Sequence, residues 1–173
     1  MSLAGTLQLW ISLSLAALFA LSALPKLTRP AAFMDSLGSY RLLPGFLMPA
    51  CAILVPVVEL AVAAGLCFPS TRPIALAAAA AMLAVYCVAV GAAWWLGAGG
   101  EDCGCGGDEG VPIGGWLLAR NVLLLSFVLA GLAFPDTGEP GKVGGLIAAI
   151  GVIVAAFVYD WINVFIRSEY ETD

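Results

Sequence analysis

Two cysteines separated by a single glycine form the most reactive pattern in this chain. Cys103 and Cys105 lie in the segment EDCGCGG, residues 101–107. Glycine permits the unusual backbone angles that a very small disulfide ring needs. A strained, accessible disulfide is easily reduced, which is typical of redox-active pairs. The spacing therefore favours thiol–disulfide exchange, and the alternatives are a pair that holds a soft metal such as Cu(I) or an inert loop.

The surroundings of this pair limit its chemistry. Glu101, Asp102, Asp108 and Glu109 lie in the same loop with no basic residue among them. These carboxylates disfavour a thiolate, unless Arg120 reaches back to the loop and offsets them. The chain has no histidine, so the commonest general base is missing and a closed zinc site cannot be built here. In the thiol-exchange interpretation we therefore expect no bound metal.

The composition indicates that the chain is a membrane protein. Of 173 residues, 62% are hydrophobic and 11% are charged, and the mean hydropathy is +1.01. A soluble domain needs far more charged residues to cover its surface. The net charge of −5 and the lack of a basic stripe exclude nucleic-acid binding. The chain is therefore expected to be an integral, multi-pass protein of the cell (inner or plasma) membrane, in contact with lipid.

Apolar segments of about 20 residues predict the transmembrane helices. The first has no preceding Lys or Arg, which favours a retained helix over a cleaved signal peptide. The predicted fold class is all-α, a polytopic helical bundle of about five transmembrane helices plus a short interfacial helix. The predicted spans are residues 7–24, 47–68, 74–96, 113–134 and 143–165.

The connection between the first two spans predicts the interfacial helix. Pro30 is suited to the first turn of a helix, and Phe33, Leu37 and Tyr40 follow at the spacing of one helical face. Asp35 and Ser36 are expected to point away from that face. An ordinary amphipathic connector explains this pattern at least as well as a ligand-binding role does.

Ionisable residues within the spans are candidate functional groups, because charges at membrane depth usually face the bundle interior. Glu59 and Arg120 could form a pair, although their depths differ by about 12 Å at about 1.5 Å per residue. A buried structural pair and a proton or quinone site are both compatible with them. Asn121 follows Arg120. Lys26, at the end of the first span, could instead anchor that end by snorkelling.

Three further cysteines lie in the second and third spans. Cys51, Cys67 and Cys87 are expected to behave as small apolar residues. Cys51 differs from the other two, because it begins the second span. Successive crossings would place it on the same membrane face as the loop that carries Cys103.

Several short motifs, in this order along the chain, resemble the MauE family of methylamine-utilisation membrane proteins, which is grouped with DoxX-like redox-associated proteins. The resemblance covers about residues 10–134, so residues 1–134 are interpreted as a four-helix MauE/DoxX-like domain and 135–173 as an added transmembrane helix with a polar tail. The motifs are PKL at 25–27 with Pro30 and Phe33, YRLLP at 40–44, PVVEL at 56–60, DCGCG at 102–106, and Arg120-Asn121.

The resemblance implies a role in disulfide formation during maturation of the methylamine dehydrogenase small subunit, beside a thioredoxin-like thiol protein. It implies that Cys103 and Cys105 are the redox pair, with Lys26, Glu59, Arg120 and Asn121 as supporting residues. One interpretation is a thiol–disulfide oxidoreductase that could use a quinone as acceptor. The other is a non-catalytic assembly factor that docks a maturing client protein and uses the cysteine loop as a clamp or soft-metal holder.

Two criteria disagree on the membrane orientation. Lys26, Arg29, Arg41 and Arg167 share the face of the cysteine loop, whereas only Arg72 and Lys142 lie on the other. The positive-inside rule therefore places the loop in the cytoplasm, but disulfide chemistry belongs on the oxidising side. We favour an extracytoplasmic loop, because Lys26 and Arg29 can be explained by the site itself.

Labelling with a membrane-impermeant maleimide tests this orientation. We predict that reagent added to intact, reduced cells modifies cysteines of the 97–115 loop without permeabilisation. Labelling that occurs only after permeabilisation would place the loop in the cytoplasm.

Overall fold

The computed structural model describes residues 3–101, 103, 112–133, 145–146 and 149–153. Helices dominate these ranges, as the hydropathy predicts. Their bounds are α1 Leu3–Thr28, α2 Pro30–Ser39, the 3-10 turn η1 Gly45–Leu47, α3 Met48–Cys67, α4 Arg72–Trp95 and α5 Gly115–Ala133.

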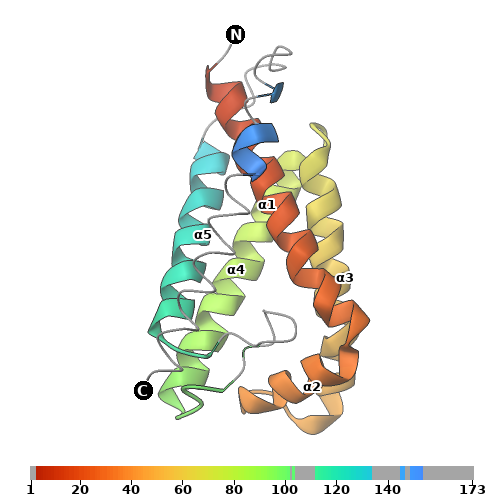
Figure 1. Cartoon of the computed structure of the whole chain (residues 1–173), viewed down its shortest axis with the longest axis vertical. Helices are drawn as coiled ribbons and strands as arrows, with labels where there is room; N and C mark the ends of the chain where they lie inside the picture. The colour runs from red at the N-terminus through yellow and green to blue at the C-terminus, as the bar shows by residue number, and fades with distance from the viewer. Residues whose placement is uncertain (1–2, 102, 104–111, 134–144, 147–148, 154–173) are drawn as a thin grey trace.

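The four long helices form a bundle in which each packs against two neighbours (Figure 1). Helix α1 contacts α3 and α5, and α4 contacts the same two helices. Helices α3 and α5 are therefore diagonal to each other. The short helix α2 packs on α3 and α1 and lies across one end of the bundle (Figure 1).

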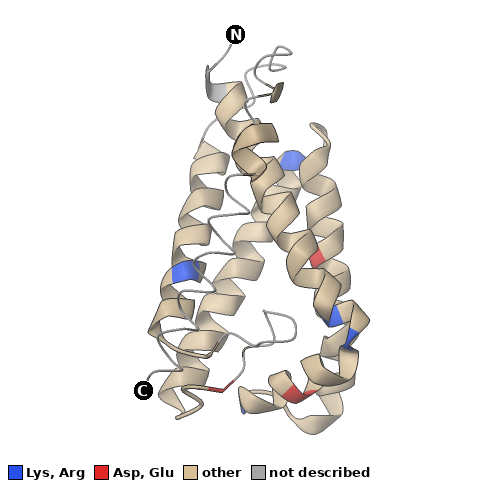
Figure 2. Cartoon of the chain, viewed as in Figure 1, with Lys and Arg blue, Asp and Glu red and all other residues tan. Residues whose placement is uncertain are grey.

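The outer surface of the bundle is apolar. Large side chains such as Ile53, Ile74 and Val88 are 63–75% exposed, and few charged residues lie along the helices (Figure 2). Such a surface suits lipid rather than water. The four long helices are each long and apolar enough to cross a membrane, so the chain is a polytopic helical membrane protein.

Four of the five predicted spans are confirmed by α1, α3, α4 and α5. The fifth, residues 143–165, lies mostly outside the described residues. Of that span only residues 145–146 and 149–153 are described, and they are helical. The proposed division at residue 134 also falls in a range that the structure does not describe.

The predicted short helix is confirmed as α2, with Pro30 in its first turn. Phe33 is buried and Asp35 is exposed, as the apolar spacing indicates. The prediction for Ser36 is wrong, because its side chain is only 7% exposed. Its hydroxyl donates to the backbone carbonyl of Ala32 at 3.1 Å, and this hydrogen bond lets a polar side chain face the bundle.

The main apolar core contains residues of all four long helices, and at one point in it α5 closely approaches α1 and α4. Gly131 of α5 is buried there, and a Cβ atom at this position would lie 3.1 Å from Ile11 Cγ2 and 3.4 Å from Leu76 Cδ2. Ile11 and Leu76 belong to the main apolar cluster. The missing side chain therefore allows α5 to pack closely against its two neighbours.

We predict that Gly131→Leu destabilises the bundle by about 1–3 kcal/mol, because it overpacks this junction. Gly91→Leu in α4 is the matched control, since a Cβ there meets nothing within 4 Å. Thermal unfolding in detergent compares the two variants. Equal melting temperatures would contradict the close packing at Gly131.

Candidate functional site

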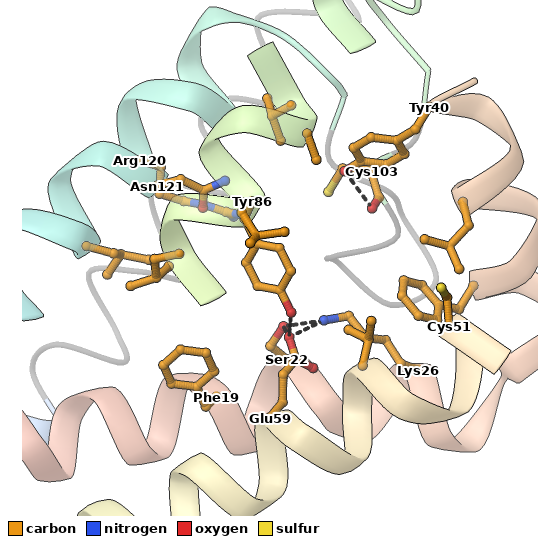
Figure 3. A pocket seen from close by; sticks show the side chains of 18 of the residues that line it. Phe19, Ser22, Lys26, Tyr40, Cys51, Glu59, Tyr86, Cys103, Arg120 and Asn121 are labelled. Carbon is orange, nitrogen blue, oxygen red and sulfur yellow. Dashed lines mark hydrogen bonds and ion pairs between the residues drawn. The ribbon is translucent and has the colours of Figure 1, made fainter. Parts of the chain in front are cut away.

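A cavity of about 340 Å³ lies inside the bundle. Residues of α1 to α5 and of the connections after α2 and after α4 line it, so it lies toward the end of the bundle that α2 covers (Figures 1 and 3). Its walls are mainly apolar, with a few polar groups, as is usual for small-molecule sites. The polar and thiol-bearing residues on these walls are Ser22, Lys26, Tyr40, Cys51, Glu59, Tyr86, Cys103, Arg120 and Asn121.

The centre of the polar wall is the carboxylate of Glu59, which is fully buried. Its Oε1 atom accepts hydrogen bonds from Lys26 Nζ at 2.5 Å, the Tyr86 hydroxyl at 2.8 Å and the Ser22 hydroxyl at 3.2 Å. The donors come from α1 and α4, and Figure 3 shows them converging on Glu59. One carboxylate oxygen therefore connects three helices.

Lys26 is buried, with a side chain only 4% exposed. Its ammonium also donates to Ser22 Oγ at 2.9 Å and lies 5.5 Å and 5.7 Å from the ring centroids of Phe33 and Tyr86. Ion pairing, hydrogen bonding and cation–π contacts together compensate the charge for its lost hydration. Lys26 therefore does not snorkel to the membrane surface.

The expected pair between Glu59 and Arg120 is wrong, because the cation on Glu59 is Lys26. Two physical reasons explain the difference. Helices α3 and α5 are diagonal in the bundle, whereas α3 packs directly against α1. The depth mismatch noted from the sequence also opposes a direct contact. Arg120 and the buried Asn121 nevertheless line the same cavity, on α5.

Cys103 lies in the cavity wall and is only 2% exposed. The accessible position that favours thiol exchange is therefore not found for the Cys103 side chain. Positive φ angles at Gly97 and Gly100 turn the chain after α4, and Cys103 packs in a small apolar cluster that includes Ile113. The Tyr40 hydroxyl donates to the Cys103 carbonyl at 3.2 Å. Tyr40, the residue that follows α2, thus holds the start of the cysteine loop.

The remaining cysteines separate into two groups. Cys51 lines the same cavity as Cys103, in agreement with the expectation that both lie toward one membrane face. Cys67 is exposed at the last residue of α3, and Cys87 is half-buried in α4. Cys105 lies outside the described residues, so its predicted pairing with Cys103 stays a prediction.

Two residues of the site were not singled out from the sequence. Ser22 precedes Lys26 by four residues, which puts both on one helical face. Tyr86 is a hydroxyl-bearing residue in the middle of an apolar span, where a buried hydroxyl needs a hydrogen-bond partner. Both signals are readable in the sequence, but neither identifies Glu59 as the shared acceptor.

We predict strong coupling between Lys26 and Glu59. Lys26→Met and Glu59→Gln alone should each cost up to about 3–5 kcal/mol, because each leaves a buried partner uncompensated, whereas the double variant should be close to wild type. Thermal unfolding in detergent measures all three. Arg120→Met combined with Glu59→Gln is the control and should be additive. Additive effects for Lys26 and Glu59 would contradict the pairing.

Comparisons with known proteins agree with the resemblance seen in the sequence. A protein called methylamine utilization protein MauE from Paracoccus versutus is 37% identical over 146 residues, covering 84% of this chain and 77% of that protein. Proteins of the same name from Methylophilus methylotrophus and Paracoccus denitrificans are 37% and 35% identical, covering 82% and 84% of this chain and 73% and 82% of their own lengths.

No solved structure matches the chain significantly. The family model described as methylamine utilisation protein MauE matches residues 4–134, which include the four long helices, α2 and the cysteine loop. The chain belongs to the MauE family.

Proposed function

We propose that this chain is a thiol–disulfide oxidoreductase of the plasma membrane that supports disulfide formation in an exported client protein. Its relatives are named for methylamine utilization, and we propose that the client belongs to that process. The observation that carries the proposal is the position of Cys103 in the wall of an intramembrane cavity that also contains the Lys26–Glu59 pair. A loop cysteine with only a structural role would not need to lie in the same cavity as a buried ion pair.

The exchange uses the Cys103–Cys105 disulfide as the oxidant. A thiolate of a thioredoxin-like partner attacks one sulfur and forms a mixed disulfide, which releases the other cysteine as a thiol after protonation. The partner's second thiolate then attacks the mixed disulfide. The partner leaves with a disulfide, having lost two electrons and two protons, and both cysteines of this chain are left as thiols.

The burial of Cys103 assigns different roles to the two cysteines in this proposal. A soluble partner needs an accessible sulfur, and Cys103 is only 2% exposed. Cys105 therefore forms the mixed disulfide, and Cys103 is the thiol that leaves toward the cavity; in the reverse direction the Cys103 thiolate attacks the mixed disulfide and releases the partner. The hydrogen bond from Tyr40 to the Cys103 carbonyl keeps Cys103 at the wall of the cavity.

A trapping experiment tests this assignment. In cells that express the client pathway, Cys103→Ser should accumulate a reducible adduct of higher mass, because the Cys105 thiolate attacks the disulfide of the oxidised partner and no Cys103 thiol is present to release it. Cys105→Ser and the double variant should accumulate none. Acid quenching, thiol alkylation and non-reducing electrophoresis measure the adduct, and mass spectrometry identifies the partner.

Cys67→Ser is the matched control, because Cys67 is exposed at the far end of α3 and should not change the adduct. An adduct on Cys105→Ser alone would reverse the two roles. If no variant forms an adduct and the double variant still supports client maturation, the chain is a non-catalytic assembly factor instead.

A further inference from the structure

The cavity extends beyond what exchange with a soluble partner requires. Cys103 contributes to its wall, but so do residues deep in the bundle, including Phe19, Leu83 and Leu124. Exchange between disulfides takes place at the sulfurs and does not need an apolar chamber of about 340 Å³. This volume lies at the lower end of the range for small-molecule sites. The cavity therefore has room for a small, mainly apolar ligand beside the thiol.

The carboxylate of Glu59 indicates what such a ligand must offer. Its Oε1 atom accepts all three hydrogen bonds from Lys26, Tyr86 and Ser22. Its Oε2 atom is buried and has no hydrogen-bond partner among the described residues. A buried carboxylate oxygen without a partner carries a large desolvation cost. A ligand hydroxyl that donates to Oε2 would remove that cost.

Helix α5 provides hydrogen-bond donors, which a carbonyl oxygen of a ligand would need. Arg120 and Asn121 belong to the cavity wall on that helix, and their side chains carry N–H donors. The cavity thus combines donors for a carbonyl oxygen with an acceptor for a hydroxyl. A ligand whose oxygens alternate between carbonyl and hydroxyl forms fits both.

The proposed function also requires an electron acceptor, and the same kind of ligand can serve as one. Each disulfide passed to a client leaves Cys103 and Cys105 as thiols, and the pair must lose two electrons and two protons before the next cycle. An acceptor that reaches a cavity at membrane depth has to be soluble in lipid. Quinones accept two electrons and two protons, and their ring oxygens change from carbonyl to hydroxyl as they do so.

We infer that the cavity binds a membrane quinone that reoxidises the Cys103–Cys105 pair, an inference that rests on the proposed function. Two S–H bonds break and one S–S bond forms, while the quinone gains two electrons and two protons and becomes a hydroquinone. Glu59 Oε2 accepts the hydrogen bond of a hydroquinone hydroxyl. Lys26 and Tyr86 hold the carboxylate in place, and are positioning residues in this step.

Anaerobic oxidation of the purified, reduced chain in detergent tests the inference. The probe is a short-chain benzoquinone with every ring position substituted, which prevents addition of thiols to the ring. Wild type should consume one quinone for each Cys103–Cys105 pair oxidised, measured by ultraviolet absorbance and by mass after alkylation. Ala89→Phe and Val55→Phe, which fill the cavity, should slow the reaction at least about tenfold.

Each cavity-filling variant has a matched control on the same helix. Ala84 and Leu54 are exposed and do not line the cavity, so Ala84→Phe and Leu54→Phe should oxidise as wild type does. Melting temperatures verify that all four variants fold. Oxidation of Ala89→Phe and Val55→Phe at the wild-type rate would overturn the inference.

A binding measurement that involves no electron transfer gives a second test. In the Cys103→Ser/Cys105→Ser background, quinone should slow alkylation of Cys51, which lines the cavity, and leave alkylation of the exposed Cys67 unchanged. Unchanged labelling of both would overturn the inference. If the client adduct forms in cells but quinone neither oxidises nor protects the protein, only this inference fails. If no adduct forms, the proposed function fails as well.

Discussion

A carboxylate buried in an apolar bundle is the constraint on which this structure depends. Glu59 has no exposed surface, and an uncompensated charge at membrane depth costs several kcal/mol. Compensation comes from Lys26 and Ser22 of α1 and Tyr86 of α4. Because one oxygen accepts all three hydrogen bonds, it determines how α1, α3 and α4 are positioned along their axes. Apolar packing alone specifies such positions weakly, since lipid competes equally well for apolar surface.

The same interaction explains why the interior contains a cavity at this end of the bundle. Lys26, Glu59, Arg120 and Asn121 point into this end of the bundle, whereas Gly131 marks a close approach of α5 to α1 and α4. Helix α2 and the loop after α4 cover this end, and the hydrogen bond from Tyr40 to Cys103 joins them. The thiol is thereby placed in the wall of the cavity instead of at the surface of the bundle.

Much of the architecture could be predicted because hydropathy and the residues that begin a helix can be identified from neighbouring positions in the chain. Long apolar segments predict α1, α3, α4 and α5, and Pro30 predicts the start of α2. The ionic partners were harder to predict. Spacing along the chain says which residues share a helical face, but it does not say which helices are neighbours. From the sequence, Arg120 is therefore a candidate partner of Glu59, and Lys26 is interpreted as an anchor. Likewise, an acidic, glycine-rich loop looks exposed, and the burial of Cys103 depends on contacts with residues far along the chain, such as Tyr40.

The sequence by itself determined the membrane location, the four long helices and the MauE family, because composition, apolar length and ordered motifs are all carried by neighbouring residues. Only the tertiary structure decided the rest. It paired Glu59 with Lys26, buried Cys103, and brought residues from five helices and two connecting segments around one cavity. These features follow from which helices are adjacent and which are diagonal. In a membrane, that arrangement is selected by a few buried polar contacts and close-packed glycines, whose energies depend on partners distant in the chain.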